Sequence, residues 1–234
     1  MRMRYKPYAR PELNAWPAYA QRPQDFAGKW QTFFKNPAFP LRLELGCGKG
    51  GFLASLALRE QNFNYLGVDL KSEVLVVAKR NIEKQFAQAG LPVGNVAITS
   101  QNIEHIDAIL CPPDVVERIY INFCNPWHKG GYAKHRLTHP RQLTLYRSLL
   151  PPGGEIYFKT DDALLFEDSL RYFDFAGFSV VWQTWNLHQK EPAWNIRTEH
   201  EEMFSKEGIP IKACIATLQP ADLRWEQIVQ LKNL

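Results

Sequence analysis

A glycine-rich segment between an expected strand and an expected helix constrains this chain most strongly. The expected short strand LRLEL (41–45) leads directly into Gly46-Cys47-Gly48-Lys49-Gly50-Gly51, and residues 51–58 read as a helix. Glycines at such a turn let a ligand approach the backbone closely, and the start of the helix offers free N–H groups. The segment therefore predicts a ligand-binding loop at the carboxyl end of a strand.

Strands and helices alternate through most of the remaining chain. In residues 71–89, Val74, Ala78, Ile82 and Phe86 recur every four residues, which is typical of a helix with one apolar face. Further helices are expected at 163–173 and after Thr138, read as an N-cap ahead of Pro140. The expected strands are 41–45, 64–68, 95–99, 117–123, 155–160, 178–185 and 211–218. This alternation predicts an α/β fold: a doubly wound, mostly parallel seven-stranded sheet with helices on both faces.

The first 40 residues differ from the rest because they are rich in proline and aromatic residues. Proline at this density disfavours long regular elements. We expect residues 1–40 to form a basic, aromatic arm packed on the core, with one short helix near 25–34, and residues 41–234 to form the main domain.

Composition excludes several classes of protein. The 234 residues contain no apolar run near the ~20 residues that span a bilayer, and no secretory signal is visible. Four scattered cysteines without a CxxC pair indicate a reduced, cytoplasmic protein. His128, His135 and His139 match no common zinc spacing, so we expect no metal and no membrane partner.

Two segments concentrate positive charge. Residues 1–10 hold Arg2, Arg4, Lys6 and Arg10 without an acid, and residues 118–154 contain no Asp or Glu. The net charge of the whole chain is only +4, so the distribution is more informative than the sum. Acid-free basic segments interleaved with aromatic residues are typical of surfaces that bind nucleic-acid phosphates.

The acids around the glycine loop discriminate between cofactors. The spacing Gly46-x-Gly48-x-x-Gly51 also fits a dinucleotide fingerprint, which keeps a nicotinamide-dependent oxidoreductase open as an alternative. Glu44, however, would repel a pyrophosphate and attract the cationic amino group of S-adenosylmethionine. Asp69, after the second strand, is placed to bind ribose hydroxyls, and Asn102 to bind the edge of an adenine.

The segment Asn125-Pro126-Trp127 follows the fourth expected strand. An Asx-Pro-aromatic turn at a strand end can direct an amide and an aromatic face toward a flat base, although Asn-Pro is also a common turn pair. We expect Trp127 to stack on a base, and Trp194 to belong to the core.

Taken together, these segments make the chain resemble the bacterial tRNA (guanine-N7-)-methyltransferase family. The matching segments are MRMRYKPYA at the N-terminus, ELGCGKGGF (44–52), GVDLKS (67–72), INFCNPWHKGGYAKHRL (121–137), FKTDD (158–162) and IRTEHEEMFSKEGIPI (196–211). They occur in the family's order along nearly the whole chain. The resemblance implies the class I fold of methyltransferases that use S-adenosylmethionine, and a guanosine of the tRNA variable loop, position 46, as substrate.

The resemblance also implies roles for individual residues. Cofactor binding falls on Glu44, Gly46, Gly48, Asp69, Asn102 and Asn125, and Asn125 also occupies the catalytic position. Substrate binding falls on Lys129, Asp161, Thr198, Glu199, His200 and Glu201. Apart from the resemblance, the basic side chains of Lys134 and Arg136 predict contacts to tRNA phosphates. The chain departs from the family at Asn125 and Asn102, where Asp is usual, at His128, where Pro is usual, and at Gly130-Gly131, where basic residues are usual.

These observations leave one principal alternative to the enzyme. A catalytically weak tRNA-binding protein would keep the fold and the basic surface, and Asn125 motivates that alternative. The sequence is compatible with both a monomer and a homodimer.

Overall fold

The computed structural model describes residues 5–220. It divides the chain into two compact units, Met1–Val115 and Val116–Leu234. Arg2 and Arg4 of the first basic segment lie outside the described residues. A boundary between an arm and a main domain near residue 40 stays a prediction.

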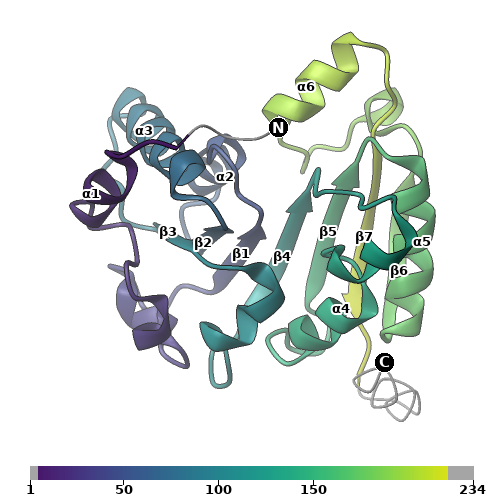
Figure 1. Ribbon diagram of the computed structural model, residues 1–234, viewed down its shortest axis with the longest axis horizontal. Coiled ribbons are helices and arrows are strands. Elements are labelled where there is room, and N and C mark those ends of the chain that lie inside the picture. The colour runs from purple at the N-terminus through teal and green to yellow at the C-terminus, as the bar shows by residue number, and fades with distance from the viewer. Residues whose placement is uncertain (1–4, 221–234) are drawn as a thin grey trace. The chain divides into compact units, whose positions relative to one another are not determined.

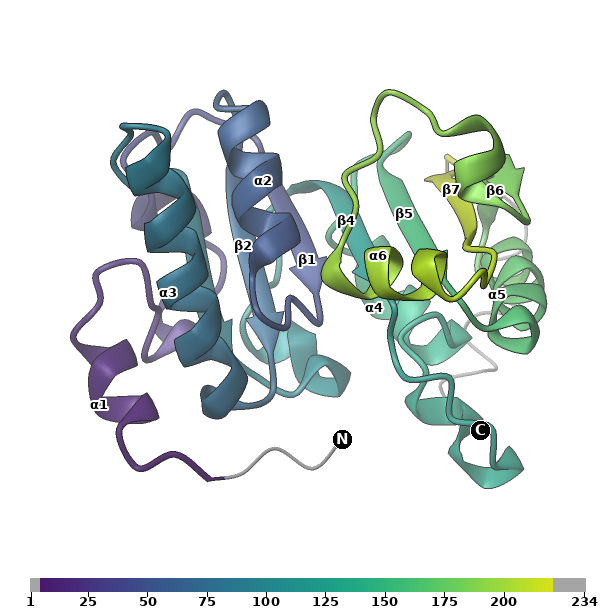
Figure 2. The ribbon, with the colours of Figure 1, turned by 90° about the horizontal axis from the view of Figure 1, so that it is seen from above.

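The first unit is built on three parallel strands in the order β3-β2-β1. Its strands are β1 (Leu41–Leu45), β2 (Asn64–Asp69) and β3 (Val96–Ser100). Its α-helices are α1 (Ala9–Asn14), α2 (Gly51–Arg59) and α3 (Ser72–Gln88), and the 3₁₀ segments are η1 (Pro23–Phe26), η2 (Trp30–Phe33) and η3 (Ile103–Ala108). Figure 2 shows α2 and α3 side by side over one face of these strands. The expected strands and helices between residues 41 and 100 are confirmed to within two residues.

The apolar face of α3 explains why this helix forms and how it packs. Ala78, Ile82 and Phe86 are buried, as the four-residue spacing predicts, and Val74 is half-buried. After the helix, Gly90 adopts a φ of 68°, a conformation that glycine reaches without strain.

The N-terminal segment contains more local structure than the sequence indicates. Two 3₁₀ turns, η1 and η2, replace the single helix expected near 25–34, and α1 was not expected. The prediction of aromatic packing is confirmed for Trp30, which is fully buried and donates its indole N–H to Ile109 O at 2.6 Å. It is wrong for Tyr5 and Tyr8, which are exposed.

The second unit holds four strands in the order β4-β5-β7-β6. Its strands are β4 (Val116–Asn122), β5 (Glu155–Thr160), β6 (Phe178–Thr184) and β7 (Lys212–Leu218), and its helices are α4 (Pro140–Arg147), α5 (Ala163–Phe175), α6 (Glu199–Lys206), η4 (Gly130–His135) and η5 (Leu187–Lys190). β4 and β5 are parallel, whereas β7 runs antiparallel to both β5 and β6. Figure 1 shows α6 beyond the arrowheads of β4 and β5.

Two helix starts in this unit depart from expectation. His139, not Thr138, caps α4, because its ring nitrogen accepts a hydrogen bond from Arg141 N, while the buried Thr138 hydroxyl lies 2.7 Å from Ser169 Oγ. The sequence patterns above do not predict the helix α6. It begins with a capping box in which Thr198 and Glu201 each bind the other's backbone N–H.

The seven strands establish the fold class. The pairings β1–β2, β2–β3 and β4–β5 are parallel, and only the pairings of β7 are antiparallel among those within each unit. The predicted mostly parallel, Rossmann-like α/β fold is therefore confirmed. Across residues 5–220, no helix combines the length and apolarity that crossing a membrane requires.

Candidate functional site

The glycine loop after β1 presents open backbone to a ligand. Gly46 N and Cys47 N donate to Val68 O, which ties the loop to the end of β2. A side chain built at Gly46 or Gly51 would meet nothing within 4 Å. The space beside the backbone at these two glycines is therefore open, as a ligand-binding loop requires.

A third glycine in this loop has a role that the sequence pattern did not identify. Gly50 adopts a φ of 71° at the start of α2, and a Cβ there would lie 2.9 Å from Ala78 Cβ. Gly50 therefore allows the close approach of α3 to the loop. The consecutive pair Gly50-Gly51 was the available signal, since only one of the two fits the fingerprint.

Two carboxylates place negative charge on the loop. Glu44, near the end of β1, is only 3% exposed. Asp69 Oδ2 accepts a hydrogen bond from Gly48 N at 3.1 Å, and Oδ1 accepts one from Lys71 N at 3.2 Å. Burial raises the pKa of Asp69, and backbone hydrogen bonds lower it in part.

Besides burial, the two carboxylates also raise the pKa of Cys47, whose thiol lies between Gly46 and Gly48 in the sequence. Burial raises the pKa of Cys47 well above its ordinary value, and the charges of Asp69 and Glu44 raise it further. A loop under two nearby carboxylates favours a cationic ligand and disfavours a pyrophosphate. The two carboxylates therefore fit S-adenosylmethionine better than a nicotinamide dinucleotide. Asn102, which is exposed, caps η3 by accepting a hydrogen bond from Glu104 N at 3.1 Å.

The turn after β4 holds Asn125 in a defined orientation. Asn125 Oδ1 accepts a hydrogen bond from Trp127 N at 3.1 Å. Phe123 and Trp127 have φ angles of 53° and 46°, a left-handed conformation that aromatic residues rarely adopt. Such backbone costs about 1–3 kcal/mol per residue and clusters at ligand-binding sites. The turn thus exposes Asn125 with its carbonyl oxygen already oriented.

Arg136 does not lie where a phosphate contact requires it. Its side chain is 4% exposed and forms an ion pair with Asp168 at 2.6 Å. Its Nε donates to Pro126 O at 2.7 Å. Because the guanidinium is buried between α5 and the turn, Arg136 is corrected from a phosphate contact to a residue that anchors the turn. Lys129 and Lys134, by contrast, are exposed.

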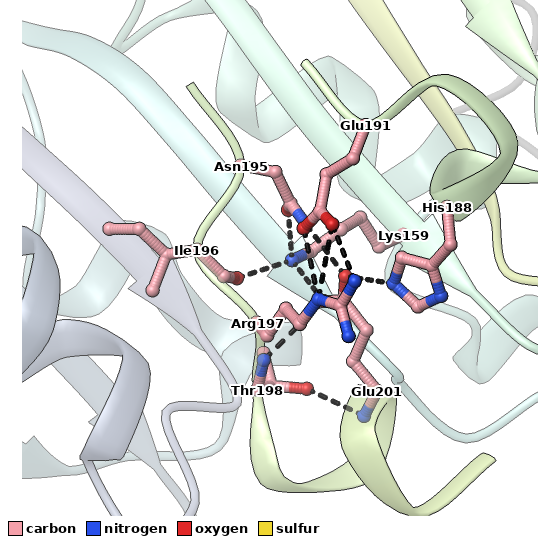
Figure 3. Close-up of polar contacts among 8 residues, drawn as sticks. All are labelled: Lys159, His188, Glu191, Asn195, Ile196, Arg197, Thr198 and Glu201. Atoms are coloured by element: carbon pink, nitrogen blue, oxygen red, sulfur yellow. Dashed lines mark hydrogen bonds and ion pairs between the residues drawn. The ribbon is translucent and has the colours of Figure 1, made fainter. Parts of the chain in front are cut away.

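A buried ion pair anchors the start of α6 (Figure 3). Lys159 Nζ donates to Glu201 Oε2 at 2.6 Å, and also to Asn195 Oδ1 and Ile196 O. Glu201 accepts further hydrogen bonds from Asn195 Nδ2 at 2.7 Å and shares one of 2.9 Å with His188 Nε2. The loop that precedes α6 is thereby fastened to β5.

This network corrects the role expected of Glu201. Its side chain is 0% exposed and its two oxygens are engaged by protein donors, so it is not available to guanine. Thr198 caps α6, whereas Glu199 and His200 on the first turn are exposed, and the His200 ring stacks on Phe123 with centroids 6.0 Å apart. The expected acidic run is therefore a helix start with one buried acid.

The same network contains a trio with metal-ligand chemistry. Single atoms of His188, Glu191 and Glu201 lie within 4.8 Å of one another. Both carboxylates already bind a protein cation, because Lys159 pairs with Glu201 and Arg197 with Glu191 at 2.6 Å. A divalent ion would have to displace these cations, and we therefore assign the trio no metal.

The remaining predicted site residues have separate positions. Asp161 follows β5, is half-buried, and accepts a hydrogen bond from Lys212 Nζ through its backbone oxygen at 2.8 Å. His128 Nε2 lies 3.0 Å from Asp162 Oδ2. Trp194 packs edge-on against Tyr157 and Trp182, as expected of a core residue.

The seven-stranded fold and a glycine loop flanked by carboxylates are typical of class I methyltransferases. The sequence profile of a family described as "Putative methyltransferase" matches residues 38–214. The solved structure of the 16S rRNA methyltransferase KamB superposes with a TM-score of 0.55 at 13% identity, covering 77% of this chain and 88% of that one, and supports the fold alone.

Relatives with assigned names identify the particular family of methyltransferases. The tRNA (guanine-N(7)-)-methyltransferase of Ruminiclostridium cellulolyticum is 54% identical over 217 residues, which cover 92% of each chain. The protein of the same name from Clostridium perfringens strain SM101 is 53% identical over 92% of this chain and 99% of its own. The chain belongs to the tRNA (guanine-N(7)-)-methyltransferase family.

Proposed function

We propose that this protein transfers the methyl group of S-adenosylmethionine to N7 of guanosine 46 in the variable loop of tRNA. The observation that carries the proposal is the 54% identity to a curated tRNA methyltransferase over 92% of both chains. The exposed lysines Lys129 and Lys134, in a segment of 37 residues (118–154) without an acid, agree with an RNA substrate.

The first unit supplies the groups that hold the cofactor. Gly46 and Gly48 provide backbone that a ligand can approach, and Glu44 balances the positive amino group. Asp69 accepts hydrogen bonds from the ribose hydroxyls, and the Asn102 amide binds the adenine edge. When bound, S-adenosylmethionine supplies an electrophilic methyl group on a sulfonium.

Guanine N7 sets modest demands on the protein. It has an in-plane lone pair and carries no proton, so transfer needs no general base. The protein must align the base and surround it with mildly negative groups as it becomes cationic. Asn125 meets both demands at the catalytic position, because its carbonyl oxygen is already oriented and carries a partial negative charge. In this proposal Asn125 also contacts the cofactor.

Substrate recognition uses those members of the predicted set that are exposed or half-buried. Glu199 and Asp161 accept hydrogen bonds from the guanine N1–H and 2-amino group, which selects guanine over adenine. Thr198 and His200 complete the set of groups around the base, and Lys129 contacts the tRNA substrate. Lys134 binds a phosphate. Arg136 and Glu201 are omitted because both are buried and ion-paired.

The test is methyl transfer from labelled S-adenosylmethionine to two tRNA transcripts, one with guanosine and one with adenosine at position 46. We expect label in the first transcript only. The Asn125→Asp variant keeps the acceptor for Trp127 N and should keep turnover, whereas Asn125→Ala should lower it about tenfold or more. Binding of both ligands without transfer would instead identify a tRNA-binding protein that has lost catalysis.

A further inference from the structure

Three aromatic rings gather on the surface of the segment that follows β4. Trp127 and Tyr132 are stacked, with ring centroids 5.9 Å apart and planes 13° from parallel. His135 packs against both rings, with centroids at 5.5 and 6.0 Å. Trp127 is 36% exposed and Tyr132 50% exposed. Contiguous apolar rings left open to solvent mark an interaction surface.

The backbone under these rings is fixed before any partner arrives. Asn125 Oδ1 holds Trp127 N, and the buried Arg136 holds Pro126 O. Arg136 is in turn paired with Asp168 on α5. A surface that is already ordered loses little conformational entropy when a partner binds, and therefore binds it more tightly.

The charges beside the rings favour one kind of partner. Lys129 and Lys134 are exposed and lie three residues before and two residues after Tyr132. From residue 118 to 154 the sequence contains no acid that would neutralise them. Aromatic faces between cations are complementary to a nucleobase between phosphates, and an apolar protein partner would not need the two cations.

We propose that the Trp127–Tyr132 pair is a stacking platform for an unpaired nucleobase of RNA, with Lys129 and Lys134 binding the phosphates on either side. The proposal rests on the proposed function and adds a second base contact, distinct from the methylated guanine. Each ring covers one face of the other, so the base stacks on an outer face. Stacking on an aromatic ring accepts any base, so the platform is not restricted to guanine.

Two RNA probes without guanine separate stacking from phosphate binding. The first is a 12-mer of uridine, and the second is an abasic ribose-phosphate 12-mer of the same charge. Binding of each is measured with the full-length protein and with Tyr132→Ala, Tyr132→Phe and Phe175→Ala. Phe175 serves as the control because it is an exposed aromatic residue on a different element, α5.

We expect Tyr132→Ala to weaken binding of the uridine 12-mer about fivefold or more and to leave the abasic 12-mer unchanged. Tyr132→Phe and Phe175→Ala should bind both probes as the unmodified protein does. Equal binding of the uridine 12-mer by Tyr132→Ala and the unmodified protein would overturn the proposal. An equal loss of affinity for both probes in Tyr132→Ala would also overturn it, and so would a failure of the unmodified protein to bind the uridine 12-mer. Methylation of tRNA by the same preparation tests the proposed function separately.

Discussion

Lys159 and Glu201 form an ion pair of 2.6 Å although their side chains are only 4% and 0% exposed. The two residues are 42 positions apart in the chain and join β5 to the first turn of α6. Burying two charges is costly unless further hydrogen bonds satisfy both groups. Here Asn195, Ile196 and His188 supply those bonds, so the pair holds the segment that carries Thr198, Glu199 and His200.

Removing the charge of Glu201 should therefore destabilise the protein strongly. Glu201→Gln leaves the Lys159 ammonium buried without a counter-charge, and we expect a loss of about 3 kcal/mol in the free energy of unfolding. The exposed neighbour Glu202→Gln is the matched control and should change it by less than about 0.5 kcal/mol. Urea denaturation measures both values. Equal stability of the two variants would show that the ion pair contributes nothing.

The same region should make stability fall in acid. The hydrogen bond from Arg197 lowers the pKa of Glu191 from 4.5 to about 2, although burial opposes the shift. Burial would raise the pKa of Glu201, but Lys159 outweighs it and the net direction is down. A carboxyl whose folded pKa is lowered stabilises the fold fully above its unfolded pKa, and that stability is lost as pH falls from about 4.5 toward 2.

Urea denaturation at pH 7, 5, 4 and 3 tests this dependence. We expect similar free energies of unfolding at pH 7 and 5 and a decline below about pH 4.5. Arg197→Gln should reduce the decline, because Glu191 would then titrate nearer to its unfolded pKa. A free energy of unfolding that is constant from pH 5 to 3 would contradict the assignment.

Arg136 and Lys134 should have opposite phenotypes although both were expected to bind phosphate. Arg136→Gln breaks the buried pair with Asp168 and should lower the free energy of unfolding by about 2 kcal/mol or more. Lys134→Gln should leave stability unchanged, weaken tRNA binding, and reduce the slope of log K against log salt concentration by roughly one. An unchanged salt slope for Lys134→Gln would exclude the phosphate contact.

Glu44 should act on the amino group of the cofactor and not on its adenosine. Glu44→Gln is expected to weaken S-adenosylmethionine binding roughly tenfold or more, because a hydrogen bond to a charged group is lost. Methylthioadenosine, which lacks the amino-acid portion, should bind the variant and the unmodified protein equally. Isothermal titration calorimetry measures both ligands. An equal loss of affinity for methylthioadenosine would mean that Glu44 maintains the shape of the loop and does not bind the cationic amino group.

Much of the fold could be predicted because local sequence patterns determine it. The strand at 41–45 is buried along its length and leads into glycines, and α3 repeats its apolar residues every four positions. These signals lie within a few consecutive residues. The sequence does not predict α1, because Pro11 lies in a proline-rich stretch; the structure places Pro11 in the first turn of a helix of only six residues.

The candidate site was less predictable because its key distinctions depend on distant partners. Nothing in the local sequence separates Glu201 from Glu199, yet one is buried against Lys159 and the other is exposed. Arg136 and Lys134 differ in the same way, since only the fold brings Asp168 to Arg136. The T-x-x-E spacing of Thr198 and Glu201 was a usable signal for a capping box and hence for α6.

The most direct test of the account is nucleoside mass spectrometry of an unmodified tRNA transcript after incubation with the purified protein and S-adenosylmethionine. We expect 7-methylguanosine, which maps to position 46 of the variable loop after nuclease digestion. A transcript that stays unmethylated, while the same protein binds both S-adenosylmethionine and tRNA, would contradict it.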